Sequence, residues 1–382
     1  MDSSRWFSVD RWSVMKFAII TWYHCCEYTA IGGGESAMRR IAVGLTTLGH
    51  SVDYVIYGCD TAHTVDINAK LCIHYCTTFD DAMTQLRFHY DHVFTIYLLP
   101  KDRLRYGWFQ KRMKNTSFHK WVLGTPAGVL QWTALLIEVL VGTRNGRVFT
   151  ISPKTTRRFS VLRIANTLLL PPVPDYYYKT DNHGEEAVRR LTYIGRLGPE
   201  KGADRVLSLF EGLSQYDNVE TAVYGYRWNE SRSEITFETH LNGHVEREIR
   251  KASSLRHKPE DEQRIGEILR DTDILVLPYR SMAGTIDPPL LLLEAMAAGC
   301  ACLTCPVGNV AEIYGESPFI IRGNFVPQTM DMVQAVLSDQ TVLERERERV
   351  KRRILELNCA TSTICATLVN QCIAAEENFL YV

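Results

Sequence analysis

Two series of alternating apolar strands and amphipathic helices, separated by a proline-rich stretch, limit the fold of this chain more than any other feature. Apolar segments typical of buried strands recur through the first series, at 17–21, 51–57, 92–98, 120–123 and 147–152. Between the first two segments, Met38, Ile41 and Leu45 recur at helical spacing, and Gly49 ends that helix. Such alternation predicts a parallel sheet with helices on both faces.

A second series follows Pro171-Pro172-Val173-Pro174 and a polar stretch. Its apolar segments lie at 191–195, 219–224, 274–278 and 300–304, and a charged helix is expected at 344–357. We therefore predict an α/β protein with two doubly wound, Rossmann-like domains that face each other across a cleft. Ligands of such sheets bind beyond the carboxyl ends of the strands, so the loops there are the places to seek chemistry.

The same pattern predicts the domain boundaries. They are a leader at 1–14, an N-terminal acceptor domain at 15–170, a linker at 171–187, a C-terminal donor domain at 188–358, and a helical segment at 359–382 that packs back on the N-terminal domain. Met15 directly precedes the first strand and is an alternative start of the protein.

Composition excludes several classes of protein. The net charge of −1 does not suit electrostatic binding of nucleic acid or membrane by the chain as a whole. The first 14 residues contain no apolar signal region, and the apolar stretch at 135–141 is shorter than the roughly 20 residues that span a bilayer. We expect a cytoplasmic protein, with contact at the inner face of the membrane only through a local patch.

The chain has 11 cysteines, an odd number in a long sequence, which favours reduced thiols over a disulfide framework. Cys300, Cys302 and Cys305 lie in an apolar run. We interpret them as small core residues on a strand, and the alternative is a metal site.

The segment from Asp287 to Gly299 predicts a buried helix. Asp287 suits the N-cap, Pro288 the first helical position, and Gly299 the position after the last turn. Glu294 is the one charge inside this apolar helix, and a buried carboxylate is costly without strong partners. We expect it to accept hydrogen bonds from ligand hydroxyls, the alternative being contact with solvent or a neighbouring loop.

Two glycine-rich loops have the composition of phosphate-binding sites. Arg196 and Lys201 lie in Gly195-Arg-Leu-Gly-Pro-Glu-Lys-Gly202 directly after a strand, where a guanidinium and an ammonium could hold a diphosphate. Gly32, Gly33 and Gly34 precede a helix, so their backbone could approach phosphates at its start. The alternative for both loops is an ordinary turn without a ligand.

Together these segments resemble the retaining glycosyltransferases of sequence family four, which have the GT-B fold. The resemblance covers most of the chain from Met15 to about Leu357. The matching motifs are Gly33-Gly34-Glu35, Leu45-Thr-Thr-Leu-Gly-His-Ser-Val52, Gly195-Arg-Leu-Gly-Pro-Glu-Lys-Gly202, Thr272-Asp-Ile-Leu-Val-Leu-Pro278, Pro289-Leu-Leu-Leu-Leu-Glu-Ala-Met-Ala-Ala-Gly299 and Gly308-Asn-Val-Ala-Glu312.

The resemblance implies transfer of a sugar from a nucleoside-diphosphate sugar to an acceptor hydroxyl, with retention at the anomeric carbon. Arg196 and Lys201 would hold the diphosphate and stabilise its charge as it leaves. Glu294 would bind the ribose hydroxyls, while Gly32 to Gly34 and Leu290 would face the donor. No metal or other cofactor is expected, because the two cations and the helix dipoles stabilise the same charge.

Two departures from the family pattern leave alternatives open. The family has another glutamate eight residues before the one that corresponds to Glu294, and that position is Ile286 here. The nearest acid is Asp287, which acts either as the catalytic substitute for that glutamate or as a plain N-cap. The expected histidine of the N-terminal domain is absent from 97–100 and 124–128, and we interpret His92 and His119 as structural. The alternatives are a catalytically silent nucleotide-sugar-binding protein and a GT-B sugar-nucleotide epimerase.

Residues 101–121 combine cations with aromatic residues. Trp108, Phe109, Phe118 and Trp121 are interleaved with seven lysines and arginines, opposed only by Asp102. This pattern suits peripheral contact with anionic lipids or a lipid-linked acceptor, and the alternative is a solvated basic loop over a buried aromatic core. The partners we expect are therefore a nucleotide-sugar donor and a glycan or lipid-linked acceptor, and no nucleic acid.

Overall fold

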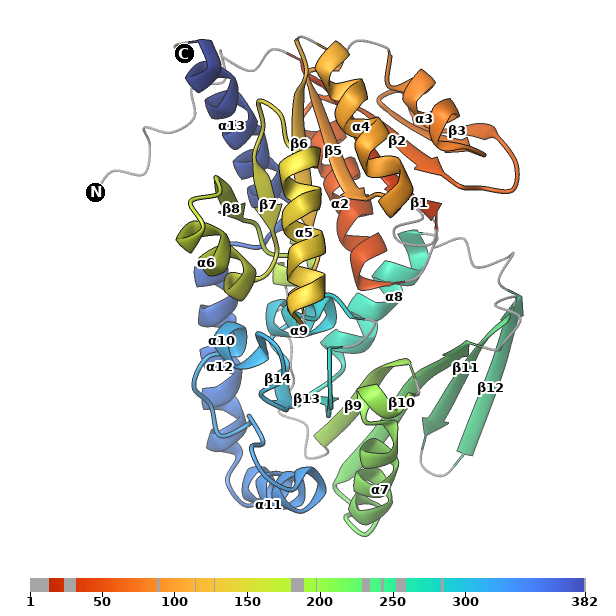
Figure 1. Ribbon diagram of the computed structural model, residues 1–382. Coiled ribbons are helices and arrows are strands. Elements are labelled where there is room, and N and C mark those ends of the chain that lie inside the picture. Colours follow the sequence, from red (N-terminus) through yellow and green to blue (C-terminus); the bar gives the residue numbers. More distant parts are fainter. Residues whose placement is uncertain are drawn as a thin grey trace.

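The computed structural model describes residues 14–23, 32–87, 90–113, 115–126, 128–179, 189–196, 198–228, 234–241, 244–251, 259–282 and 285–380. Side chains are outside the description at Arg196 and in the ranges 225–251, 259–263 and 376–380. Residues 1–13 of the expected leader and 180–187 of the expected linker also lie outside it. Two α/β units, one in each half of the chain, account for the described residues (Figure 1).

The N-terminal unit is built on an eight-stranded sheet of order β3-β4-β2-β1-β5-β6-β7-β8. All neighbouring strands are parallel except β3 and β4, which are antiparallel. The strands are β1 (Lys16–Trp22), β2 (Ser51–Tyr57), β3 (His63–Asn68), β4 (Leu71–Cys76), β5 (His92–Tyr97), β6 (Ser117–Val122), β7 (Val148–Thr150) and β8 (Asn166–Leu168). The strands predicted near 17–21, 51–57, 92–98, 120–123 and 147–152 are confirmed.

Helices cover both faces of this sheet because its strands are apolar on both sides. On β1, Phe17 and Ile19 contribute to the core beneath α2 and α13, whereas Ala18 and Ile20 contribute to the core beneath α3 and α4. Side chains alternate along a strand, so these two sets point to opposite faces. The helices are α2 (Gly33–Thr47), α3 (Phe79–Gln85), α4 (Pro100–Arg112), α5 (Val129–Gly142), α6 (Pro153–Val161) and α13 (Thr361–Leu380).

The C-terminal unit has a six-stranded sheet of order β12-β11-β10-β9-β13-β14. Its strands are β9 (Arg189–Arg196), β10 (Val219–Trp228), β11 (Glu234–Leu241), β12 (His244–Lys251), β13 (Ile274–Leu277) and β14 (Ala301–Thr304). The parallel set β10-β9-β13-β14 is the one the sequence predicted, and β11 and β12 extend it in antiparallel fashion. The sheet is therefore mixed, which strand-helix alternation alone did not indicate.

Helices also pack around the second sheet, and two short 3₁₀ helices complete the elements. These are η3 (Asp175–Lys179), η4 (Pro199–Lys201), α7 (Ala203–Leu213), α8 (Pro259–Arg270), α9 (Leu290–Ala297), α10 (Val310–Tyr314), α11 (Phe325–Ser338) and α12 (Gln340–Leu357). The charged helix expected at 344–357 is α12, longer by four residues at its start.

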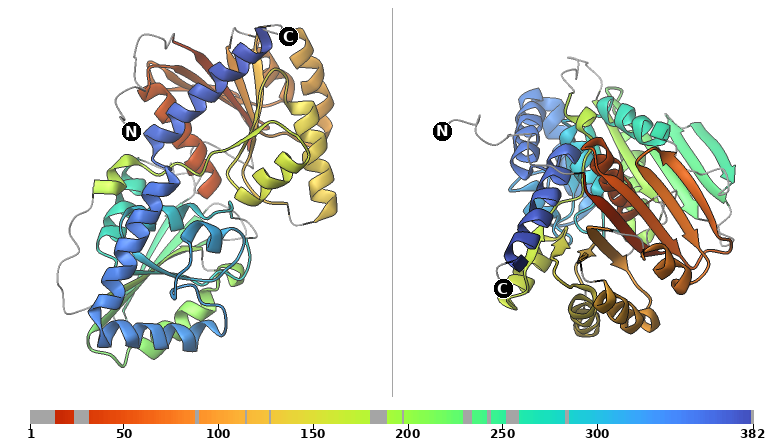
Figure 2. Two further views of the ribbon diagram at one scale, coloured as in Figure 1. Left: turned by 90° about the vertical axis from the view of Figure 1, so that its left-hand side faces the viewer. Right: turned by 90° about the horizontal axis from the view of Figure 1, so that it is seen from above.

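The chain crosses back to the N-terminal unit after α12. Asn358 adopts the left-handed conformation (φ 50°), and Ala360 forms a bridge with Val173 in the segment that joins the two units. Helix α13 then packs on α2, and Ile364, Cys365 and Leu368 belong to the N-terminal core (Figure 2). The two units are thus joined by two chain segments, at 171–174 and 358–360. Among the described helices, none is both long and apolar enough to cross a bilayer.

Candidate active site

Described segments that follow strands of both sheets come together between the two units. Gly33, at the start of α2, lies against Ile286 and Leu290, and Thr125 and Ser152, after β6 and β7, lie against Asn309 after β14 (Figure 1). Each of these segments lies beyond the carboxyl end of a parallel strand, which is where ligands of doubly wound sheets bind. The fold therefore brings together the segments at 32–34, 198–202, 287–294 and 308–312, which are far apart in the sequence.

The glycine-rich start of α2 lies against the start of α9. Gly32 is the N-cap residue of α2 in extended conformation, and Gly34 is buried. A Cβ atom added to Gly33 would lie 3.1 Å from Cγ1 of Ile286 and 3.7 Å from Cβ of Leu290. A side chain at position 33 would require the Ile286 side chain to shift by a few tenths of an ångström. The glycines therefore allow close contact between the units, in addition to any approach to a ligand.

Glu294 is buried on α9 and paired with Arg40 of α2. One guanidinium nitrogen of Arg40 donates to Oε1 of Glu294 at 2.5 Å, and the other donates to the carbonyl oxygen of Pro172 at 3.0 Å. Both side chains are about 95% buried. The pair connects a helix of each unit with the linker segment. Sequence reasoning expected a strong partner for Glu294, but it had no signal that the partner would be Arg40.

Asp287 does not cap α9, so that prediction is wrong. The helix begins at Leu290 with Pro289 at the N-cap, and the Asp287–Pro288 peptide bond is cis. The carboxylate of Asp287 instead accepts two hydrogen bonds from Asn309, one from the backbone N–H at 2.8 Å and one from Nδ2 at 2.7 Å. Gly299, with φ 77°, does follow the last turn of α9 as expected.

Lys201 lies in η4 and is buried against the loop after β13. Its Nζ is 4.5 Å from the centre of the Tyr279 ring. The next residue, Gly202, has φ 72°, and a Cβ there would meet the carbonyl oxygen of Pro278 at 2.2 Å. Only glycine combines this backbone angle with that approach. The loop geometry thus holds Lys201 next to the segment that leads to α9.

Arg196 is the last residue of β9, where it pairs with Tyr226 of β10. Its backbone therefore lies at the carboxyl end of the strand, as the motif predicted. Its side chain, and all of Leu197, lie outside the described residues.

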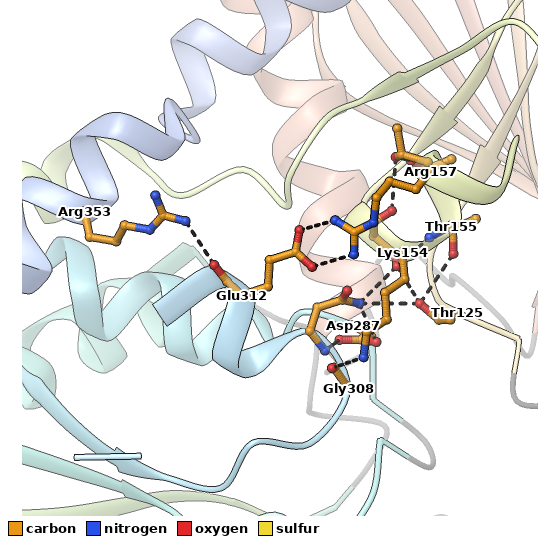
Figure 3. A network of polar contacts seen from close by, with 12 residues as sticks. Thr125, Lys154, Thr155, Arg157, Asp287, Gly308, Glu312 and Arg353 are labelled. Atoms are coloured by element: carbon orange, nitrogen blue, oxygen red, sulfur yellow. Dashed lines mark hydrogen bonds and ion pairs between the residues drawn. The ribbon is translucent and has the colours of Figure 1, made fainter. Parts of the chain in front are cut away.

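A network of polar contacts joins the units at the loops after β6, β7 and β14 (Figure 3). Nδ2 of Asn309 donates to Oγ of Ser152 at 3.0 Å and is 3.4 Å from Oγ1 of Thr125. Both hydroxyls belong to the N-terminal unit, and Ser152 also caps α6. Asn309 therefore connects Asp287 with the other unit. Asn309 has no role among the sequence-based predictions. The sequence does contain Ser152 before Pro153, a pattern typical of a helix start, and this pattern could have indicated the loop that Asn309 contacts.

Two basic side chains of α6 extend this network. Nζ of Lys154 donates to the carbonyl oxygen of Gly308 at 2.5 Å. Arg157 binds Glu312 through both guanidinium nitrogens, at 2.5 and 2.8 Å, and lowers the pKa of that carboxyl below its usual value. Arg353 of α12 donates to the backbone oxygen of Glu312. Bidentate pairing gives this contact a defined geometry.

Replacing Asn309 with aspartate should destabilise the protein at neutral pH. It would set a carboxylate against Asp287 where an amide now donates, and we expect a loss of about 2–4 kcal/mol in the free energy of unfolding. The loss should shrink near pH 4, because a proton bound between the two carboxyls removes the repulsion. Urea unfolding at pH 7 and pH 4 measures both effects.

The matched control is Asn324→Asp at the exposed N-cap position of α11, where the asparagine side chain makes no cap hydrogen bond and aspartate is equally favoured. Equal stability of both variants at pH 7 would contradict the contact between Asn309 and Asp287.

His92 and His119 form a buried pair next to Cys372. One ring nitrogen of each histidine and the Cys372 sulfur lie close enough together to surround a metal ion. The backbone N–H of Arg147 donates to Nδ1 of His119 at 3.0 Å, so a neutral His119 carries its proton on Nε2. That nitrogen lies 3.2 Å from Nδ1 of His92 and donates to it rather than ligating a cation. Burial lowers the pKa of His92 to about 4 and that of His119 well below 6.5. Both act as neutral core residues.

A second group of metal-binding side chains comprises Asp53, Cys72 and His74. Lys16 already lies 3.2 Å from the Asp53 carboxylate, and the Tyr90 hydroxyl donates to it at 2.6 Å. Burial alone would raise the pKa of Asp53, but hydrogen bonds from His74 and Tyr90 and the charge of Lys16 lower it to about 2. These contacts satisfy the carboxylate within the protein.

Cys300 and Cys302 are core residues, whose thiols donate to the carbonyl oxygens of Leu269 and Cys300.

The aromatic residues of 101–121 do not all face outward, which corrects the expected pattern. Phe118 and Trp121 are fully buried in β6, and Lys120 is buried beside Glu138. Trp108 on α4 is exposed. A buried strand after α4, rather than a continuous basic loop, explains the difference, and Lys114 lies outside the described residues.

The second unit matches a known protein family. Residues 188–339 match the family model described as "Glycosyl transferases group 1". These residues therefore resemble a group 1 glycosyltransferase domain. The match spans β9 to α11, and thus includes Lys201, Asp287, Leu290 and Glu294. A search of curated proteins finds no match to the sequence.

Solved structures resemble this chain over both units. Sucrose-phosphate synthase from Thermosynechococcus elongatus is 14% identical with a TM-score of 0.64, and the match covers 94% of this chain and 100% of that one. HepE from Anabaena in complex with UDP is 11% identical with a TM-score of 0.64, over 94% and 100% of the two chains.

An α,α-trehalose-phosphate synthase from Burkholderia vietnamiensis is 8% identical with a TM-score of 0.62, over 94% and 100%. These likenesses show the GT-B fold, and the predicted pair of Rossmann-like domains is confirmed. The domain match and these likenesses together support a glycosyltransferase enzyme.

Proposed function

We propose that the enzyme transfers a sugar from a nucleoside-diphosphate sugar to the hydroxyl of a glycan or lipid-linked acceptor, with retention at the anomeric carbon. One observation carries the proposal. Within the domain that matches the glycosyltransferase model, the start of α9 lies against the glycine-rich start of α2 from the other unit. Several related folds bind such donors: solved neighbours hold UDP-glucose, UDP or ADP.

The residues present suit the chemistry of a departing diphosphate. Lys201 and Arg196 would bind its oxygens, because negative charge grows there as the bond to the sugar breaks. Lys201 is buried, so its ammonium acts with little screening by water. The backbone at Gly32 to Gly34 would add N–H donors at the start of α2. These groups supply the positive charge for which a metal would otherwise be needed.

The two acids of the site would act differently from each other. Glu294 lies on α9 at the boundary between the units, and we propose that its carboxylate binds the ribose hydroxyls of the donor. Asp287 would position the loop after β14 through Asn309 rather than ligate the sugar directly. Leu290, the first residue of α9, would line the donor site between them.

The test is a donor screen followed by product analysis. Thermal shift with UDP, GDP and ADP sugars should identify a stabilising donor, and slow hydrolysis of that donor should release the nucleoside diphosphate. NMR of the released or transferred sugar at early times should show the anomeric configuration of the donor. Inverted product would overturn retention. Nucleotide binding with neither hydrolysis nor transfer, across glycan and lipid-linked acceptors, would favour the silent binding protein instead.

A further inference from the structure

Three neighbouring helices of the N-terminal unit carry large apolar side chains on their outer surface. On α5, Val129, Leu130 and Leu140 are 82%, 86% and 73% exposed. Further exposed apolar residues on α4, on α5 and at the end of α6 are Leu104, Trp108, Ile137, Val161 and Leu162. We call these eight residues and the cations around them the α4–α6 surface. Large apolar groups gathered on one surface of a soluble domain mark an interaction site.

Contacts join each of these helices to the next, α4 to α5 and α5 to α6. A Cβ on Gly107 of α4 would meet Cγ1 of Val141 at 3.0 Å, which shows how closely α4 approaches α5. The guanidinium of Arg158 on α6 lies 4.6 Å from the ring of Trp132 on α5. Figure 2 shows α4 and α5 along the outer edge of the molecule, away from α2 and α13.

Cations predominate on this surface. Of the eight lysines and arginines in the three helices, Lys154 and Arg157 bind Gly308 and Glu312 of the other unit, Arg105 pairs with Asp80 of α3, and Arg103 pairs with Glu138. The other four, all exposed, are Lys101, Lys111, Arg112 and Arg158. The two acids of these helices, Asp102 and Glu138, are buried, and Glu138 is neutralised by Lys120 and Arg103. Lys111 and Arg112 are exposed, and Arg112 lies 5.5 Å from the Trp108 ring. The outer surface is therefore apolar and positively charged, in a chain whose net charge is −1.

We propose that the α4–α6 surface docks on an anionic lipid bilayer. Leucine, valine and tryptophan would enter the boundary between headgroups and acyl chains, while lysine and arginine would bind anionic headgroups. A protein partner of ordinary composition would not need this excess of cations around an apolar centre. The surface differs from the patch expected at 101–121, because Phe118 and Trp121 are buried and α5 supplies four of the eight exposed apolar residues.

Docking would place the candidate active site near the bilayer. Helix α5 begins four residues after Thr125, whose hydroxyl is in contact with Asn309 across the two units. An acceptor anchored in the same bilayer would then reach the site along the start of α5. This consequence rests on the proposed function, whereas docking itself does not.

The experiment is flotation of the full chain with vesicles of phosphatidylcholine alone or with about one third phosphatidylglycerol, in the absence of donor. We expect binding to the anionic vesicles that weakens strongly between about 0.05 M and 0.5 M salt. The triple variant V129S/L130S/L140S should bind at least about tenfold more weakly, because three apolar side chains no longer enter the bilayer. The variant K101A/K111A/R112A should lose preference for anionic vesicles.

Exposed residues of the other unit provide matched controls. L207S/L355S removes two exposed leucines from α7 and α12, and R352A removes an exposed arginine from α12. Both should float as the parent protein does. Equal floating of all variants, or no floating of the parent protein, would overturn the proposal. So would a dimer of the parent, found by analytical ultracentrifugation, that V129S/L130S/L140S abolishes without loss of vesicle binding. Because no donor is used, failure here leaves the proposed reaction untouched.

Discussion

Replacing Glu294 with alanine should destabilise the protein by about 3–5 kcal/mol, which is the largest effect on stability that we expect from a single change. The substitution leaves the Arg40 guanidinium buried without its carboxylate, and a buried charge that has lost its partner is far more costly than the pair. Urea unfolding of both proteins measures the difference. A loss below about 1 kcal/mol would contradict the buried ion pair.

The double variant R40M/E294L separates stability from donor binding. Because it removes both charges and keeps apolar volume, much of the lost stability should return, as is common when a buried pair is replaced by apolar residues. Its nucleotide affinity should nevertheless stay at least about tenfold reduced, since the ribose hydroxyls have lost their acceptor. A stable double variant that binds nucleotide like the parent protein would limit Glu294 to a structural role between α2 and α9.

Replacing Lys201 with methionine should lower kcat by about 10²–10³-fold, with a smaller change in KM. The ammonium is expected to stabilise charge that is fully developed only as the diphosphate leaves, so its loss affects the transition state more than donor binding. Methionine keeps much of the volume beside Tyr279, so the fold should persist. Steady-state transfer rates on the identified donor, together with the melting temperature, measure both effects.

Two further variants show whether the effect of Lys201→Met comes from charge. Lys201→Arg keeps a cation and should retain more activity than methionine, although a guanidinium does not replace an ammonium in every geometry. Lys70→Met removes an exposed lysine between β3 and β4 and should leave kcat unchanged. A Lys201→Met enzyme that retains more than about a tenth of kcat at an unchanged melting temperature would refute a role in leaving-group stabilisation.

Much of the fold could be predicted because its strands are short apolar runs between loops. β2 was predicted residue for residue, and β13 and β14 within one residue. β3, β4, β8, β11 and β12 were missed. β3 is exposed along its whole length, β8 has three residues, and β11 and β12 contain several charged residues, so these four lack the apolar run that marks a buried strand. β4 (Leu71–Cys76) does have such a run and is mostly buried, but it was not predicted. The strands at or next to a sheet edge form because a neighbouring strand offers hydrogen bonds, not because their own sequence is apolar.

The candidate site was predictable only in part. Motif spacing made Lys201, Leu290 and Glu294 candidates, because these residues lie within segments that recur in a known order. It did not indicate the contacts of Arg40 and Asn309, whose partners lie 254 and 22 residues away, although Asn309 itself lies in one of the matching segments. Asp287 shows why local sequence is not enough. Its residue type suits an N-cap, but in the structure its carboxylate binds Asn309 in the loop after β14, and α9 begins at Leu290.

The sequence by itself determined two Rossmann-like halves, the glycine positions that allow close backbone contact, and a buried carboxylate in an apolar helix. These depend on local periodicity and on the properties of single residues. Only the tertiary structure decided which side chains meet across the two units, and that α4, α5 and α6 present one apolar, cationic surface. Contacts between distant segments follow from how whole sheets and helices pack, and short stretches of sequence do not encode that arrangement.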